Sequence, residues 1–403
     1  MLNELASDER KVLHAVSSLR IPTRLAILQA TGLSNGRTTR ALQSMREKGI
    51  IVSHEETRQE KGRPSIIHEI APGAFFAIGA ALTVGCCTIA AVSGTGELLE
   101  SHQLTIDARA FDEAGLRALL ERVGNDVTEA IGRRDPTRCV AVGLSVLGRV
   151  DTDRGVWSSG LQYGPFRNFD VGSALHNVGV PVMVEDHARS MAFLERRRSA
   201  APQRQDFAVL YMGEGLGSAF VLNGEIYRGH HGVAGEIGHI ALSGNERRCI
   251  CGDTGCLETV ASGSGIVATA KARMAEGVIS ILTPRGDPSE TLTLDAIHEA
   301  AKANDRLARQ VLQEAGEALG EAGSILMKML NVPRIVVCGE GSLLADCLRE
   351  PMTRRIRERA PLESQRDFQI DFALYSPSDE PIGVAMLAID GAMASAAGTA
   401  EGE

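Results

Sequence analysis

The spacing of apolar residues divides the chain into a short N-terminal region and a longer body. Over residues 1–70 the pattern predicts three helices followed by two strands. The first helix buries the apolar residues of one face, Val12, Leu13, Val16 and Leu19. A second helix is expected over 23–30, with Thr23 as its N-cap and Gly32 just beyond its end.

A third helix is expected from its N-cap Ser34 to a stop at Gly49, and it buries Ala41, Leu42 and Met45. The rest of this helix is polar and carries the residues that we predict to contact DNA: Ser34, Asn35, Arg37, Thr38, Arg40 and Gln43. A polar, arginine-bearing third helix after a short glycine turn is the pattern of a helix-turn-helix, in which this helix enters the major groove.

Two predicted strands complete the N-terminal domain and flank a charged loop. The strands are expected over 50–53 and 65–70, and the loop over 55–63 is typical of a wing. Arg63 lies in Gly62-Arg63-Pro64, from where it would reach the adjacent minor groove. The pattern therefore predicts a winged helix-turn-helix over residues 1–70 that binds a double-stranded DNA operator. The alternative is a small three-helix domain that binds a protein.

Charge is distributed unevenly and favours the DNA interpretation. Residues 20–63 contain nine Lys and Arg against four Asp and Glu, a net charge of +5. The whole chain carries −9, so the remainder carries −14. A basic module on an acidic body suits a nucleic-acid-binding head on a sensor domain.

The body after Pro72-Gly73 has a duplicated order of strands. Residues 75–99 and 207–227 each read as strand, turn, strand and turn, and apolar strands ending in glycine turns return at 139–150 and 334–341. Helical segments fall between them at 111–133, 186–198, 260–276 and 292–329. This order predicts two α/β lobes, one over 74–185 with a C-terminal helix over 381–396 packing back on it, and one over 186–380. A cleft between such lobes is a common place for a ligand.

Composition excludes several classes of protein. Hydrophobic residues make up 44% of the chain and aromatic residues only 4%, which suits a compact α/β protein with close helix–sheet packing. The polar start predicts no secretory signal, and no apolar run is long enough for a membrane span. Eight cysteines, several of them inside apolar runs, favour a reducing compartment over a disulfide framework. We therefore expect a cytoplasmic protein with no membrane partner.

Four residues predict a structural zinc site. Cys249, Cys251 and Cys256 lie within eight residues, and the intervening glycines allow the backbone to fold tightly. His239, ten residues upstream of the first cysteine, completes a tetrahedral set. Thiolates and imidazole favour Zn²⁺, and four protein ligands leave no open position for catalysis.

These motifs resemble the ROK family, which groups sugar-responsive repressors with bacterial sugar kinases. The resemblance is strongest in Ala234-Gly235-Glu236-Ile237-Gly238-His239 and in the cysteine segment that ends at Leu257-Glu258. It implies the duplicated actin-like, RNase H-like sugar-kinase fold. The kinases of the family lack an N-terminal DNA-binding module, whereas the repressors have one that ends in a Gly-Arg-Pro wing. The architecture therefore resembles the repressor branch, with a homodimer or a tetramer as the expected assembly.

The resemblance also implies a sugar site. The five positions that bind sugar hydroxyls in the family kinases correspond here to Asp186, His187, Glu236, His239 and Glu258. Carboxylates and imidazoles suit a sugar because each exchanges hydrogen bonds with adjacent hydroxyls. The expected effector is a small sugar or a sugar phosphate.

Two departures from the kinases indicate that the sugar is not phosphorylated. The catalytic aspartate of the kinases aligns with His187, and the aspartate that would organise Mg²⁺ aligns with Ala81. We therefore expect a sugar-responsive repressor with no catalytic residues. The rivals are an ATP-dependent sugar kinase with an appended DNA-binding domain, and a scaffold that binds no ligand.

Overall fold

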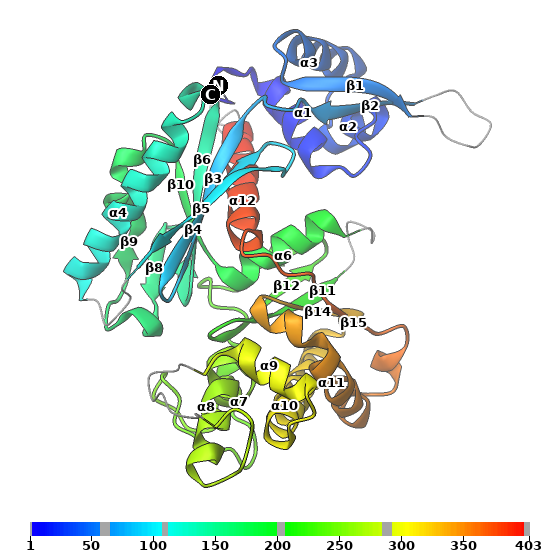
Figure 1. Cartoon of the computed structure of the whole chain (residues 1–403). Coiled ribbons are helices and arrows are strands. Elements are labelled where there is room, and N and C mark those ends of the chain that lie inside the picture. The colour runs from blue at the N-terminus through cyan, green and yellow to red at the C-terminus, as the bar shows by residue number, and fades with distance from the viewer. Residues whose placement is uncertain (1, 57–64, 107–111, 200–205, 284–291, 399–403) are drawn as a thin grey trace. The chain divides into compact units, whose positions relative to one another are not determined.

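The computed structural model describes residues 2–56, 65–106, 112–199, 206–283 and 292–398. The chain forms two compact units, of which the second comprises Leu147–Arg149 and Asp186–Asp379, and the first comprises the remainder (Figure 1). Within the described ranges, no helix has the length and apolar character needed to cross a membrane.

The N-terminal head has the predicted order of elements. A short 3-10 helix, Leu2–Glu4, precedes α1 (Ser7–Ser18), α2 (Arg24–Thr31), α3 (Asn35–Glu47), β1 (Ile51–Glu56) and β2 (Ser65–Ile70). Thr23 caps α2 by accepting a 3.2 Å hydrogen bond from the backbone N–H of Ala26. Gly32 ends α2 in the left-handed region at φ 66°, which glycine adopts without steric cost. The winged helix-turn-helix prediction is therefore confirmed in its helices and its strand pair.

The first lobe is built on a mixed five-stranded sheet in the order β10-β6-β3-β4-β5. Its strands are β3 (Phe76–Thr83), β4 (Cys86–Ser93), β5 (Leu98–Thr105), β6 (Cys139–Val146) and β10 (Val182–Asp186). The lobe also contains α4 (Glu113–Gly132), α5 (Val171–Ala174), β8 (Val156–Ser159) and β9 (Phe169–Asp170), while β7 spans Arg149–Asp151. Strands β3 and β4 pair antiparallel, whereas β3 and β6 pair in parallel.

The C-terminal helix α12 (Asp379–Gly398) packs against the sheet of the first lobe. Two strand glycines permit this approach. A Cβ at Gly79 would lie 1.8 Å from the carbonyl oxygen of Pro381, and a Cβ at Gly143 would lie 2.4 Å from that of Val384. Any larger residue at either position would therefore push the helix off the sheet.

The second unit repeats the topology of the first lobe. Its sheet has the order β13-β12-β11-β14-β15, formed by β11 (Phe207–Met212), β12 (Leu216–Leu222), β13 (Glu225–Tyr227), β14 (Arg334–Cys338) and β15 (Gln369–Phe372). Each sheet contains three consecutive antiparallel strands, and the first of them pairs in parallel with a later strand, β3 with β6 and β11 with β14. The predicted two-lobed, duplicated sugar-kinase fold is confirmed.

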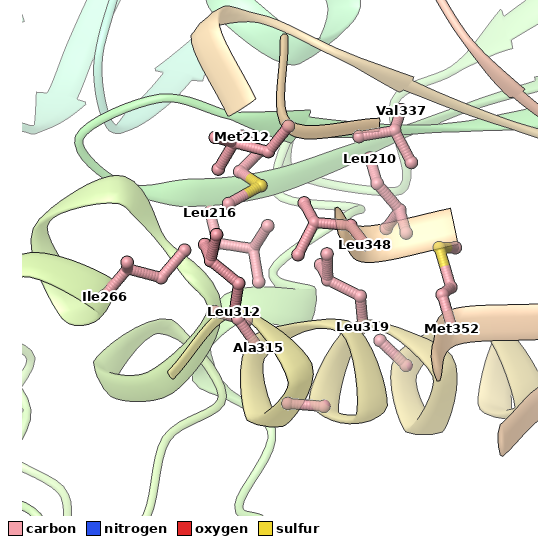
Figure 2. Packing of buried hydrophobic residues seen from close by; sticks show 14 of the residues in the cluster. Leu210, Met212, Leu216, Ile266, Leu312, Ala315, Leu319, Val337, Leu348 and Met352 are labelled. Atoms are coloured by element: carbon pink, nitrogen blue, oxygen red, sulfur yellow. The ribbon is translucent and has the colours of Figure 1, made fainter. Parts of the chain in front are cut away.

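Six α-helices lie in the described part of the second unit. They are α6 (His187–Arg198), α7 (Glu258–Ala261), α8 (Gly263–Ala275), α9 (Leu294–Lys302), α10 (Arg306–Leu330) and α11 (Ala345–Arg359). The prediction of one helical segment over 292–329 is wrong, because this segment forms two helices, α9 and α10. Asn304 adopts φ 63° between them, and Asp305 caps α10. Leu210, Leu319 and Leu348 are fully buried in the core between the sheet, α10 and α11 (Figure 2).

Candidate functional site

The exposed face of α3 carries four of the predicted DNA-contacting side chains. Asn35, Arg37, Arg40 and Gln43 are exposed. Ser34 is exposed at the N-cap, but its hydroxyl makes no capping bond. The helix therefore presents a polar strip at the surface of the head.

Thr38 does not belong to this strip. It is fully buried, and its hydroxyl bonds the carbonyl of Ser34 at 3.1 Å. Thr38 stands three, four and seven residues before Ala41, Leu42 and Met45, which is the spacing of one helix face. We therefore withdraw Thr38 from the DNA-contacting set. Arg63 lies outside the described residues.

Ion pairs hold the polar strip in place. Arg37 donates to both carboxylate oxygens of Asp8 on α1, at 2.8 and 2.5 Å, and this holds the pKa of Asp8 below its usual value. Arg24 at the start of α2 donates to the side-chain oxygen of Asn35. Arg24 is an exposed cation that the sequence interpretation left out, although its position at the start of the second helix could have indicated it.

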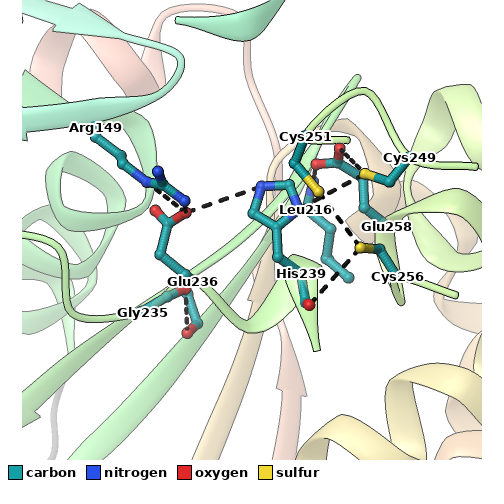
Figure 3. Close-up of polar contacts among 10 residues, drawn as sticks. Arg149, Leu216, Gly235, Glu236, His239, Cys249, Cys251, Cys256 and Glu258 are labelled. Carbon is teal, nitrogen blue, oxygen red and sulfur yellow. Dashed lines mark hydrogen bonds and ion pairs between the residues drawn. The ribbon is translucent and has the colours of Figure 1, made fainter. Parts of the chain in front are cut away.

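In the second unit, the four predicted metal ligands come together (Figure 3). Nδ1 of His239 lies 3.7 Å from Sγ of Cys249, and Sγ of Cys251 lies 3.6 Å from Sγ of Cys256. A tetrahedral zinc ion, with bonds of about 2.0 Å to nitrogen and 2.3 Å to sulfur, separates its ligands by roughly 3.5–3.8 Å. The residues therefore fit zinc in both donor type and spacing.

Two glycines shape the loop that holds the cysteines. Gly252 and Gly255 have φ angles of 102° and 89°, in the region that favours glycine. The backbone N–H of Cys249 bonds the carbonyl of Asp253 at 2.8 Å, which closes the tip of the loop. Burial and the neighbouring thiols raise the pKa of Cys256 to about 12. A bound divalent cation would supply the positive charge that clustered thiolates require.

The Ala-Gly-Glu-Ile-Gly-His motif lies tightly against β12. A Cβ at Gly235 would lie 1.9 Å from the carbonyl oxygen of Ser218, and one at Gly238 would lie 2.1 Å from that of Leu216. This contact fixes the two residues that follow the glycines, Glu236 and His239. Nε2 of His239 lies 3.9 Å from Oε2 of Glu236, so the ring directs one nitrogen to the cysteines and the other to the carboxylate.

Glu258 joins the same group from the other side. Its Oε2 accepts a 3.0 Å hydrogen bond from the backbone N–H of Leu216, and its Oε1 lies 3.9 Å from Sγ of Cys249. Glu236, His239 and Glu258 are therefore brought together around the metal ligands and one segment of β12 (Figure 3).

Asp186 and His187 occupy the N-terminus of α6, which packs on β11 and β12. Asp186 caps the helix and pairs with Arg189, whose guanidinium is almost fully buried. His187 is 2% exposed and stacks on Tyr211, with ring centroids 5.4 Å apart. No described contact joins either residue directly to Glu236.

Arg149 is a site residue that sequence reasoning missed. Its Nε and one terminal nitrogen donate to Oε2 of Glu236 at 3.0 and 2.8 Å. The two residues are 87 positions apart, so no local pattern indicates the pair. Arg149 orients the carboxylate and places a half-exposed cation beside it.

Two glycine turns of the second unit carry carboxylates that interact with each other. Glu214 lies between Gly213 and Gly215, and Glu340 lies between Gly339 and Gly341. Burial, and then the charge of Glu340, raise the pKa of Glu214 to about 6. Negative charges at glycine turns repel phosphate groups, which such turns otherwise bind through their N–H groups.

The match to the ROK family model covers residues 78–390, and the chain belongs to this family. Curated relatives include both regulators and kinases. The chain is 27% identical to the DNA-binding transcriptional dual regulator NagC of Escherichia coli (strain K12), over 79% of this chain and 76% of the relative. It is 33% identical to a glucokinase of Halalkalibacterium halodurans, over 55% of this chain and 67% of the relative.

Nearly the whole chain matches the structure of a solved ROK family transcriptional regulator, a homologue of the E. coli Mlc protein. That comparison gives a TM-score of 0.79 at 25% identity and covers 97% of this chain and 99% of the other. A ROK glucokinase from Streptomyces griseus, solved with glucose and AMPPNP, gives a TM-score of 0.67 and covers 78% of this chain.

Proposed function

We propose that this protein is a transcription repressor whose winged helix-turn-helix binds operator DNA and whose kinase-like part binds a sugar effector without phosphorylating it. The observation that carries the proposal is the extent of the structural match. The regulator covers 97% of this chain, whereas the glucokinase is matched over 99% of its own length and covers only 78% of this chain.

On the DNA side, the proposed contacts are Ser34, Asn35, Arg37, Arg40, Gln43 and the wing residue Arg63. Arg40 and Arg37 supply charge for phosphates or guanine edges, while Asn35 and Gln43 suit adenine. A homodimer would place two such helices on two half-sites. The protein is proposed to act in the cytoplasm, where its DNA lies.

On the effector side, the proposed ligands are Asp186, His187, Glu236, His239 and Glu258, with zinc as a structural cofactor held by His239, Cys249, Cys251 and Cys256. Zinc would hold the loop closed, which keeps His239 and Glu258 in place. The acceptors Glu236 and Glu258 suit the hydroxyls of a sugar or of a sugar phosphate.

The absence of phosphoryl transfer is supported by two substitutions at family positions. Ala81 lacks a carboxylate for Mg²⁺, and a buried, stacked His187 replaces the catalytic aspartate. The kinase rival predicts sugar-dependent release of ADP, which a coupled assay across hexoses and N-acylated hexosamines measures.

DNA binding is tested by fluorescence anisotropy at fixed salt, with a duplex enriched from random DNA and a scrambled duplex as control. Arg40→Ala is expected to weaken binding and to reduce the slope of log K against log salt by about 1. The matched control is Arg306→Ala, which removes an exposed arginine of the second unit. It is expected to change neither the affinity for DNA nor the salt slope. Equal affinity for both duplexes would contradict the proposal.

A further inference from the structure

A second cluster of metal-ligating side chains lies in the second unit, on helices that take no part in the zinc loop. His298 belongs to α9, whereas Asp346 and Cys347 are consecutive residues in the first turn of α11. One donor atom from each of the three side chains lies within 4.8 Å of the other two. Nε2 of His298 is 2.8 Å from Oδ1 of Asp346.

Burial differs across the cluster in a way that leaves it open to solvent. His298 is only 9% exposed and is therefore fixed, whereas the side chain of Asp346 is 53% exposed. Asp346 also lines a surface groove of about 740 Å³ along α11, together with Arg349 and Glu350. An ion could therefore reach the carboxylate of Asp346 from solvent, and the neighbouring thiol of Cys347 is partly exposed.

We infer that His298, Asp346 and Cys347 form a second, exchangeable site for a divalent transition metal such as Zn²⁺. An imidazole nitrogen and a sulfur favour zinc or cobalt over Mg²⁺ and Ca²⁺. Three protein ligands leave a fourth position for water, unlike the four-ligand zinc loop. Occupancy would tie α9 to the start of α11.

The hydrogen bond between His298 and Asp346 explains a contact between the two helices, but it does not require a thiol. Cys347 is the residue that turns the pair into a ligand set. Its Sγ lies within 4.8 Å of a ring nitrogen of His298 and of a carboxylate oxygen of Asp346. Lys302 lies close enough to act on Cys347, but its ammonium pairs with Glu299 at 2.8 Å.

The test uses the full-length protein with its zinc loop loaded, dialysed against Co²⁺. We expect a near-ultraviolet thiolate-to-cobalt absorption band and one metal equivalent per chain beyond the zinc loop. Cys347→Ser is expected to remove both the band and the extra equivalent. His298→Asn is expected to weaken cobalt binding at least tenfold, since one of three ligands is lost.

Cys86→Ser is the matched control, because Cys86 is a partly exposed thiol of the first unit. This variant is expected to keep the band and the metal content of the wild type. The inference is overturned if the wild type binds no more than one metal per chain, or if the band persists unchanged in Cys347→Ser.

Discussion

The carboxylate of Asp186 is held by Arg189, three residues later on the same helix. Oδ2 of Asp186 lies 2.5 Å from Nε of Arg189, and Oδ1 accepts the backbone N–H of Arg189 at 2.8 Å. Arg189 also donates to the carbonyl of Gly232 at 2.8 Å, four residues before Glu236. The N-terminus of α6 is therefore linked to the segment that carries the proposed sugar ligand Glu236.

Loss of this pair is expected to destabilise the second unit. Arg189→Ala leaves the partly buried Asp186 without its cation, and we expect a loss of about 3–5 kcal/mol in the free energy of unfolding. Chemical denaturation measures it. The double variant Asp186→Asn with Arg189→Met is the matched control and is expected to recover part of the loss. If Arg189→Ala leaves the stability unchanged, the pair has no structural role.

Removal of zinc is expected to weaken effector binding before it unfolds the chain. A chelator should release one zinc from the loop and weaken effector affinity more than tenfold, because His239 and Glu258 lose their positions. Cys256→Ala should reproduce this result, whereas Cys139→Ala, which alters a buried thiol of the first unit, should keep both zinc and effector affinity. Metal analysis and calorimetry provide the two readouts. Full effector affinity in the zinc-free protein would refute a supporting role for the ion.

We expect Glu236 to contribute to the affinity for the effector and to contribute little to the thermal stability of the protein. Once a thermal-shift screen of sugars and sugar phosphates has identified an effector, Glu236→Gln should weaken its binding by about 1.5–3 kcal/mol, which is the range for a hydrogen bond to a charged group. The pair with Arg149 is half exposed, so Tm should change little. Arg149→Ala should weaken binding less, since the carboxylate remains but is no longer oriented. Unchanged affinity in Glu236→Gln would remove Glu236 from the site.

The stability of the second unit is expected to fall as pH rises through the range set by Glu214. Its pKa is raised from an ordinary 4.5 to about 6, so the folded chain binds more protons than the unfolded chain between these values, and stability declines across them. Glu214→Gln should therefore raise Tm by about 2 °C at pH 7.5 and leave it unchanged near pH 4.5. Glu340→Gln should act in the same direction. An equal Tm change at both pH values would contradict this assignment.

Local features of the sequence were sufficient to predict the head, the strand order and the metal cluster. Thr23 and Gly32 mark helix ends through their own chemistry, and Cys249, Cys251 and Cys256 lie within one short loop. These features are formed by residues close together in the sequence, so they can be recognised without knowledge of the fold. The sequence interpretation placed Thr38 on the DNA-facing surface because its side chain carries a hydroxyl. Its spacing of seven residues from Met45 instead indicates the buried face of the helix.

Long-range pairs could not be predicted in this way. Arg149 contacts Glu236, which lies 87 positions later in the sequence, and His298 contacts Asp346, which lies 48 positions later. The backbone N–H of Leu216 meets the carboxylate of Glu258 across 42 positions. Each of these pairs depends on how the sheet brings distant segments together, which a single sequence does not record.

The most direct test of the central claim is an effector titration of the protein–DNA complex, followed by anisotropy at fixed salt, with nucleotide absent and then with ATP present. We expect a sugar or sugar phosphate to release the DNA to the same extent in both arms, with no formation of ADP. Release that requires ATP, or ADP formed in step with it, would contradict the account.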